Sequence, residues 1–203
     1  MNKKIAQHLL NIGAVSLQPN DPFTWTSGMK SPIYCDNRVT ISYPKVRQDI
    51  AEAFVEKIRE KYPEVEVIAG AATGGIPHAA WVSEKMNLPM VYVRGSAKGH
   101  GKKKQVEGLI KPGQKAVIVE DLFSTGGSVI KVAEALRAEE VEVLGTIGIF
   151  TYGLKKAADN FAKAELDFDT ITDFPSLLEV AELTDEERNK IEKWYQDPES
   201  WLA

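Results

Sequence analysis

A chain of 203 residues with 43% hydrophobic and 27% charged residues is long enough for one domain with a substantial core, and its composition is typical of a globular protein. No apolar run reaches the length of a membrane span, and the first residues lack a signal-peptide pattern, so we expect no membrane partner. The net charge of −4 argues against general nucleic-acid binding. The single cysteine, Cys35, excludes an intrachain disulfide and favours a cytoplasmic location.

The first forty residues show no regular alternation of strands and helices. Residues 2–12 have the apolar spacing of a short amphipathic helix that ends at Gly13. Residues 19–32 are rich in Pro, Thr, Ser and Gly and predict a loop, which leads into a short strand at 33–35. We therefore expect residues 1–40 to form a small hood subdomain over one edge of the fold.

Strands and helices alternate from residue 41 onward. A helix is expected from about 42–44 to Pro63, followed by strands 65–69, 90–93, 115–119 and 141–150 and helices 75–86 and 128–137. This alternation predicts an α/β core, residues 41–175, with a twisted, mostly parallel sheet flanked by helices. Residues 176–203 are expected to be helical, with a capping box formed by Thr184 and Glu187. The whole chain is predicted to be one domain.

The segment 116–130 carries the strongest chemical signal. A strand rich in β-branched residues is followed by two carboxylates, Glu120 and Asp121, and then by Ser-Thr-Gly-Gly-Ser at 124–128, which opens a helix. The glycines let backbone N–H groups approach an anion, and the helix dipole favours negative charge. The carboxylates repel phosphate, so they suit ribose hydroxyls, directly or through a divalent cation. The segment therefore predicts a site for a phosphorylated sugar.

This segment resembles the phosphoribosyl diphosphate (PRPP) signature of the type I phosphoribosyltransferases. An ordinary strand–turn–helix corner is the structural alternative, and a P-loop fits poorly because there is no Gly-Lys-Ser/Thr step. The resemblance implies the type I phosphoribosyltransferase fold, with a hood subdomain and a mobile catalytic loop. It also implies that PRPP contacts the acidic pair and the loop after it, namely Glu120, Asp121, Leu122, Phe123, Ser124, Thr125, Gly126, Gly127 and Ser128.

Two further stretches follow predicted strands. The glycine-rich turn 71–77, centred on Thr73 and Gly74, could cradle a diphosphate, although a purely structural turn has the same pattern. A basic run extends from Arg94 to Lys104 without an acid, and it is either a solvated face or a site for an anion. Its glycines predict a mobile loop over 94–108, which could close over a leaving diphosphate.

The basic loop resembles the catalytic loop of the orotate phosphoribosyltransferases, and the segment 23–34 resembles the one with which they cover the base. The resemblance implies transfer of the ribose 5-phosphate group of PRPP to orotate, in pyrimidine (UMP) biosynthesis. It implies Mg²⁺ as cofactor, bound mainly through PRPP and water with no direct protein ligand, and a homodimer in which loop 94–108 serves the partner's site. The implied catalytic residues are Lys98, His100 and Asp121; Arg94, Lys98 and His100 also bind PRPP, and Ser124 and Lys30 are candidate orotate contacts.

The chain departs from many bacterial members of this family at positions where they carry basic residues. It has Thr73-Gly74 where they have Tyr-Lys, and it has Gly95 and Tyr152 at two other basic positions. Other groups must then meet part of the substrate's charge. Two alternatives also stay open: a purine-base phosphoribosyltransferase, and a non-catalytic PRPP-sensing regulator on the same fold. Such a regulator should carry a basic DNA-binding extension, but residues 1–20 contain only Lys3 and Lys4.

Overall fold

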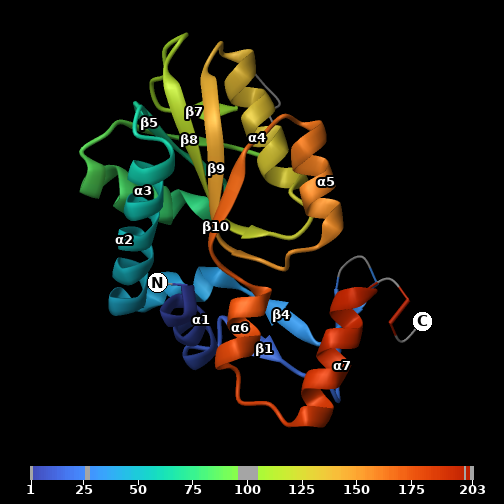
Figure 1. Ribbon diagram of the computed structural model, residues 1–203. Helices are drawn as coiled ribbons and strands as arrows, with labels where there is room; N and C mark the ends of the chain where they lie inside the picture. Colours follow the sequence, from blue (N-terminus) through green and yellow to red (C-terminus); the bar gives the residue numbers. More distant parts are fainter. Residues whose placement is uncertain (1, 26–27, 96–104, 199, 202–203) are drawn as a thin grey trace.

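The computed structural model describes residues 2–25, 28–95, 105–198 and 200–201 (Figure 1). Its centre is a six-stranded sheet in the order β10-β9-β8-β5-β6-β7. All neighbouring pairs are parallel except β6 and β7, which are antiparallel. The strands are β5 (Val67–Ala71), β6 (Met90–Val93), β7 (Val106–Glu107), β8 (Lys115–Phe123), β9 (Glu142–Thr151) and β10 (Phe168–Asp173). The predicted mostly parallel α/β sheet is confirmed.

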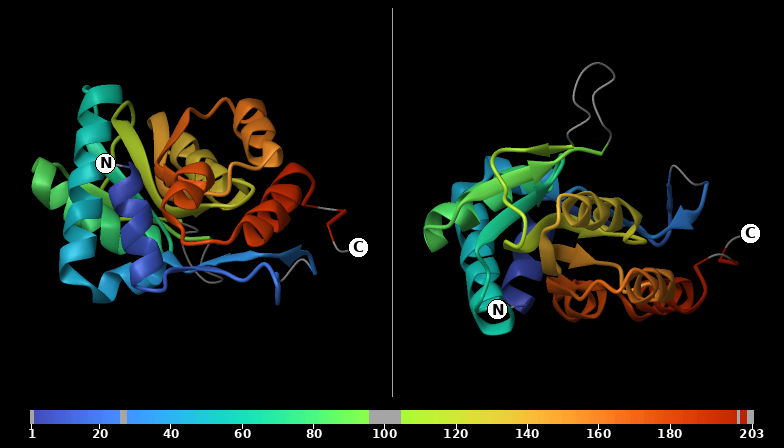
Figure 2. Two further views of the ribbon diagram at one scale, coloured as in Figure 1. Left: turned by 60° about the horizontal axis from the view of Figure 1, so that its bottom comes forward. Right: turned by 90° about the horizontal axis from the view of Figure 1, so that it is seen from above.

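Helices cover both faces of the sheet (Figures 1 and 2). α2 (Pro44–Lys61) and α3 (Gly75–Met86) pack on one face, and α4 (Gly127–Ala138) and α5 (Lys155–Lys163) on the other. Alternate side chains of a strand point to opposite faces, so Val117 packs in the first core while Ile118 packs in the second. Because β8 is buried on both faces, its sequence is a continuous apolar run rather than an alternating one.

Segments from both ends of the chain meet at one end of the sheet (Figure 1). They are α1 (Asn2–Asn11), β1 (Val15–Leu17), β2 (Phe23–Thr24), β3 (Lys30–Ser31), β4 (Ile33–Cys35), the 3₁₀ helix η1 (Asn37–Ser42), α6 (Phe174–Val180) and α7 (Asp185–Gln196). β1 pairs with β4 and β2 with β3, both antiparallel. The Trp194 Nε1 of α7 donates to the Lys30 carbonyl at 3.2 Å, and its ring meets Trp25 edge-on, with 5.9 Å between centroids. α7 therefore holds β2 and β3 in place.

The structure agrees with most predicted elements and corrects the end of the strand that carries the acidic pair. The expected strand 115–119 continues to Phe123, so the prediction that it ends before Glu120 and Asp121 is wrong. Its pairing with β9 continues through Leu122↔Phe150 and Phe123↔Thr151, which keeps the acidic pair extended. The capping box is confirmed, with the Glu187 N–H donating to Thr184 Oγ1 at 3.3 Å. Within the described ranges, no helix has both the length and the apolar character needed to cross a membrane.

Candidate active site

The segment from Leu122 to Ser128, which we call the cradle, comprises the end of β8, the loop 124–126 and the start of α4. Gly126, the N-cap of α4, has φ +78°, and a Cβ there would lie 2.9 Å from the Phe161 ring. Glycine is therefore required for both conformation and space. Asn160 Nδ2 donates to the Thr125 carbonyl at 2.9 Å and fixes the loop from α5. The first turn of a twelve-residue helix thus faces a cleft with its amides free to meet an anion.

The acidic pair lies beside this cradle in a low-dielectric setting. Glu120 is 5% exposed, and one of its carboxylate oxygens accepts from the Asp121 N–H at 2.9 Å. Burial raises the pKa of Glu120 from its usual 4.5 to about 9, and the neighbouring Asp121 carboxyl adds to the shift. The Asp121 carbonyl accepts from Asn37 Nδ2 at 2.5 Å. One proton is therefore held in this pair at neutral pH, and η1 fixes its backbone.

A buried polar chain continues from Asn37 to α3. Thr40 Oγ1 donates to the Asn37 carbonyl at 2.5 Å, and His78 Nε2 lies 3.3 Å from the same hydroxyl. Since the hydroxyl proton is used, His78 Nε2 must be the donor, which leaves Nδ1 as a bare acceptor without a partner among the described residues. Burial lowers the pKa of His78 to about 4, so the ring is neutral. His78 therefore links η1 to α3 as a neutral hydrogen-bonding group.

The second glycine-rich turn packs directly against the acidic pair. A Cβ on Gly74 would lie 2.3 Å from Asp121 Oδ2, and one on Gly75 would lie 2.3 Å from the Val119 carbonyl oxygen. Neither position accepts a side chain in this arrangement. The turn and the cradle, with Thr73 and Gly74 on one side and residues 124–128 on the other, line one cleft of about 540 Å³ together with Glu120 and Asp121.

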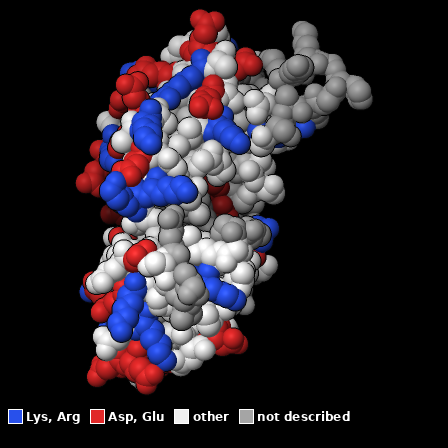
Figure 3. All heavy atoms as spheres, turned by 90° about the vertical axis from the view of Figure 1, so that its right-hand side faces the viewer, with Lys and Arg blue, Asp and Glu red and all other residues white. Residues whose placement is uncertain are grey.

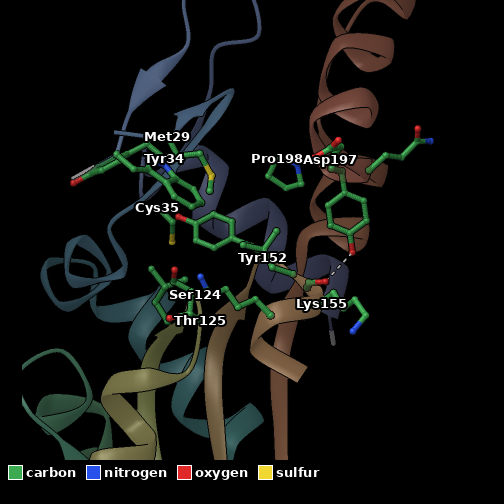
Figure 4. Close-up of a pocket in the computed structure, with 16 residues that line it drawn as sticks. Met29, Tyr34, Cys35, Ser124, Thr125, Tyr152, Lys155, Asp197 and Pro198 are labelled. Atoms are coloured by element: carbon green, nitrogen blue, oxygen red, sulfur yellow. Dashed lines mark hydrogen bonds between the residues drawn. The ribbon is translucent and has the colours of Figure 1, made fainter. Parts of the chain in front are cut away.

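A larger cavity of about 910 Å³ adjoins the cleft (Figure 4). The two share Cys35, Leu122, Ser124 and Thr125, so a ligand can extend from one into the other. The cavity walls are aromatic; the rings come from both ends of the chain and from the end of β9, namely Trp25, Tyr34, Tyr152 and Tyr195. Such walls suit a flat ring.

Tyr152 occupies the centre of the cavity and points toward Tyr34 and Cys35 (Figure 4). Its ring lies 4.9 Å from that of Trp25, centroid to centroid. Burial raises the pKa of Tyr152, which keeps the hydroxyl neutral. Tyr152 thus forms part of the aromatic wall of the cavity. Sequence reasoning noted the lost charge at Tyr152 and singled out residues 23–34, which include Trp25 and Tyr34, but it missed the packing of Tyr152 and the place of Tyr195 in the walls.

Other predicted site residues lie apart from the cleft or outside the described ranges. Phe123 is fully buried and packs on Phe161 with 5.1 Å between ring centroids, so only its backbone can face a ligand. Lys30 Nζ donates to Thr24 Oγ1 at 2.8 Å on the exposed side of β3, and Arg94 Nη1 donates to Glu107 Oε1 at 3.2 Å. Lys98 and His100 lie outside the described residues.

Figure 3 shows the side of the molecule on the right of Figure 1. Basic and acidic side chains are interspersed over its upper and lower parts, and recessed acidic atoms are visible in the hollow between them. Among the described residues, this side therefore has no broad basic surface that could attract an anionic substrate.

An anion cradle and a buried acidic pair at the carboxyl ends of parallel strands are the features that define a phosphoribosyltransferase. Residues 42–179 match the family described as the phosphoribosyl transferase domain. Orotate phosphoribosyltransferases of Halalkalibacterium halodurans and Bacillus cytotoxicus are 55% and 57% identical to the chain, over 100% of the chain and 99% and 100% of their own lengths. An Aeropyrum pernix orotate phosphoribosyltransferase structure superposes with a TM-score of 0.77 at 28% identity, over 86% of this chain and 96% of that one. The chain belongs to the orotate phosphoribosyltransferase family.

Proposed function

We propose that the cleft and the aromatic cavity together transfer the ribose 5-phosphate group of PRPP to orotate, which yields orotidine 5′-monophosphate (OMP) and diphosphate for pyrimidine synthesis. The main support for this proposal is that the cleft and the cavity are continuous, because Ser124 and Thr125 line both. A sugar phosphate in the cleft then presents its C1 to a flat ring in the cavity. The free Cys35 and the absence of a membrane-spanning helix among the described residues are compatible with our proposal of a cytoplasmic enzyme.

In this proposal each part of PRPP meets a different element. The amides and hydroxyls of 122–128 bind the 5′-phosphate, and Ser124, at the junction, also contacts orotate. Asp121 and Glu120 accept hydrogen bonds from the ribose hydroxyls, which stabilises the positive charge that develops on the ribose as diphosphate leaves. The turn at Thr73 and Gly74 lies along the diphosphate. Arg94, Lys98 and His100 neutralise the leaving group, as the family resemblance implies.

We propose Mg²⁺ as the cofactor, carried by the substrate. Among the described residues no group of three or more His, Cys, Asp or Glu side chains could hold a metal ion, so the donor set does not form a protein cage. Asp121 and Glu120 fit a lesser role, because a carboxylate can accept hydrogen bonds from the water shell that Mg²⁺ usually retains. When bound, the ion would neutralise negative charge on the diphosphate. Binding of the ion alone should therefore be weak and should strengthen with PRPP.

A comparison of candidate bases tests the proposed activity. Orotate should release diphosphate from PRPP faster than uracil, because a site built for the carboxylate leaves a donor unpaired when the carboxylate is missing. Lys30→Ala should reduce this preference more than it weakens PRPP binding. Turnover of adenine or hypoxanthine at a rate equal to that of orotate would support a purine enzyme instead. PRPP binding without turnover of any base would support the regulator.

We also propose a homodimer in which loop 94–108 contributes to the partner's site. Lys98→Ala and Asp121→Asn subunits, each nearly inactive, should then complement each other when mixed. A mixed dimer has one site with both substitutions and one with neither, so activity should recover to about a quarter of wild type if exchange is random. Proven exchange without recovery would mean that each loop serves its own subunit.

A further inference from the structure

The cleft that must accept the diphosphate of PRPP is lined by acids. The carboxylates of Asp36, Glu120 and Asp121 all face it, although Glu120 is protonated at neutral pH. A diphosphate carries several negative charges, which these groups repel unless a cation lies nearby. Among the residues that the structure describes, Arg38 is the one lysine or arginine that lines this cleft. No role was assigned to Arg38 from the sequence.

A cation cannot come from the second glycine-rich turn while Asp121 keeps its position. The Asp121 carboxylate fills the space in which any side chain at residue 74 would begin, with 2.3 Å between Oδ2 and an added Cβ. A lysine at that position would require Asp121 to move. Gly74 and the placement of Asp121 are therefore linked, and the missing charge has to enter from another element.

Arg38 enters the cleft from the opposite wall, at the start of η1. Its backbone N–H donates to Asp36 Oδ1 at 3.2 Å, as part of the N-cap of η1. Its guanidinium forms two further bonds to the same carboxylate, Nε to Oδ1 at 2.7 Å and Nη2 to Oδ2 at 2.9 Å. This bidentate contact fixes the plane of the group, although the side chain is 63% exposed.

The bond to Asp36 uses only one edge of the guanidinium. The Nη1–Nη2 edge remains, and within the described ranges Nη1 has no hydrogen bond or ion pair to another protein group. The hydrogen bonds to Asp36 and its negative charge raise the pKa of Arg38, and Arg38 lines the cleft together with Asp121. A planar edge with two parallel N–H donors matches a phosphate group.

We propose that Arg38 binds the diphosphate of PRPP through its Nη1–Nη2 edge while Asp36 holds the opposite edge. Arg38 thus supplies, from η1, the charge that Gly74 cannot carry. This inference rests on the proposed function, because it assigns a residue to one part of the PRPP site. It also predicts that Arg38 has no role toward ligands that lack a diphosphate.

Three ligands separate the diphosphate contact from the rest of the site. PRPP and magnesium diphosphate contain the group, whereas OMP occupies the 5′-phosphate, ribose and base positions without it. Affinities for all three should be measured by calorimetry for wild type, Arg38→Gln and Arg38→Lys. Arg59→Gln is the matched control, because it removes the same charge from an exposed position on α2, away from the cleft.

Arg38→Gln should weaken PRPP and magnesium diphosphate by about tenfold each, which is typical for loss of hydrogen bonds to a charged group, and should leave OMP unchanged. The affinities of Arg38→Lys for PRPP and magnesium diphosphate should lie between those of wild type and Arg38→Gln, since lysine keeps the charge but lacks the planar edge. Arg59→Gln should bind all three ligands as wild type does. Equal weakening of OMP, or no weakening of PRPP and diphosphate, would overturn the proposal. A wild type that binds PRPP but does not convert orotate would refute the proposed function, while the binding comparison would still decide the role of Arg38.

Discussion

Two buried carboxylates in this molecule have opposite surroundings. The Asp49 side chain is 2% exposed and accepts from Lys4 and His8 of α1 and from Lys45 of α2, at 3.0, 3.0 and 2.9 Å. Glu120 is similarly buried, but among the described residues no Lys, Arg or His hydrogen-bonds to it, and its neighbour is another acid. Burial raises the pKa of Asp49, but the hydrogen bonds outweigh this and bring it down to about 2, whereas the pKa of Glu120 is about 9.

We propose that this difference separates a structural carboxylate from a functional one. Asp49 is satisfied by the protein itself and joins α1 to α2. No Lys, Arg or His among the described residues hydrogen-bonds to Glu120, and its raised pKa favours the protonated form. In our proposal the ribose hydroxyls of the substrate bind to this pair, so the lack of a cationic partner distinguishes these acids from Asp49 better than burial does.

The largest effect should appear in the pH dependence of stability. The pKa of Glu120 is higher in the folded state than its usual 4.5, so its stabilising contribution is present below that value and is lost as pH rises toward about 9. Relative to Glu120→Gln, the free energy of unfolding of the wild type should fall across this window, by at most about 1.4 kcal/mol per pH unit. Urea unfolding of both proteins from pH 5 to 9 measures the slope. If the difference in unfolding free energy between wild type and Glu120→Gln stayed constant from pH 5 to 9, Glu120 would be ionised in the free protein.

Asp49→Asn should show the opposite sign. The pKa of Asp49 is lowered from 3.8 to about 2 on folding, so its contribution is present above 3.8 and is lost as pH falls through 2. Near pH 7 the substitution should cost about 2 kcal/mol of unfolding free energy, with kcat/KM unchanged because the residue lies outside the cleft. Unfolding and activity assays on one preparation check both statements. A loss of activity without a loss of stability would remove the distinction between the two acids.

Asp121→Asn should change activity and not stability. Asparagine keeps the shape that Gly74 packs against but removes the charge proposed to engage the ribose hydroxyls. Turnover should fall at least about tenfold, or roughly 1.4 kcal/mol of transition-state stabilisation, with the fold intact. Steady-state kinetics with PRPP as the varied substrate measure this. An unchanged kcat/KM for PRPP would contradict the role of the acidic pair.

The smallest effect is expected from Lys45→Ala. Lys45 is 74% exposed and its bond to Asp49 joins positions i and i+4 of one helix. Removing it should cost only about 0.3–0.5 kcal/mol, since exposed pairs of this kind are weak and Lys4 and His8 remain. Thermal unfolding at low and high salt checks this estimate. A loss of unfolding free energy as large as that of Asp49→Asn would contradict this. It would show that the Lys45–Asp49 pair within α2 stabilises the molecule more than the bonds from Asp49 to α1 do.

The sequence predicted those parts of the fold that depend on local pattern. Strand–helix alternation identified the parallel sheet, and the order of acids, hydroxyls and glycines identified the cradle, because those requirements are set by neighbouring residues. The end of β8 was misplaced because its length depends on pairing with β9, a partner distant in sequence. α5 and β10 were not identified either: α5 is a short helix of nine residues, and β10 is an edge strand whose first three residues are partly exposed.

The part of the site that escaped prediction depends on contacts between distant segments. The exclusion of a side chain at Gly74 by Asp121, and the approach of Arg38 from η1, cannot be seen in a pattern of neighbours. Tyr195 joins Trp25 in one cavity only because α7 returns to the N-terminal strands. The proposed roles of Lys98 and His100 stay predictions, since both lie outside the described residues.

The return of α7 to β2 and β3 also has a consequence for synthesis on the ribosome. The segment that contains Trp25 and Tyr34 leaves the ribosome early. Among the described residues its strands pair only within this segment, β1 with β4 and β2 with β3, and Trp194, which donates to the Lys30 carbonyl, is made near the end. α1 must likewise wait for β10 and α6, on which it packs. We infer that the aromatic wall stays exposed through most of translation. Exposed apolar surface of this kind favours aggregation, and chaperones bind to it during this period. Capacity to bind a base then begins only after α7 has left the ribosome.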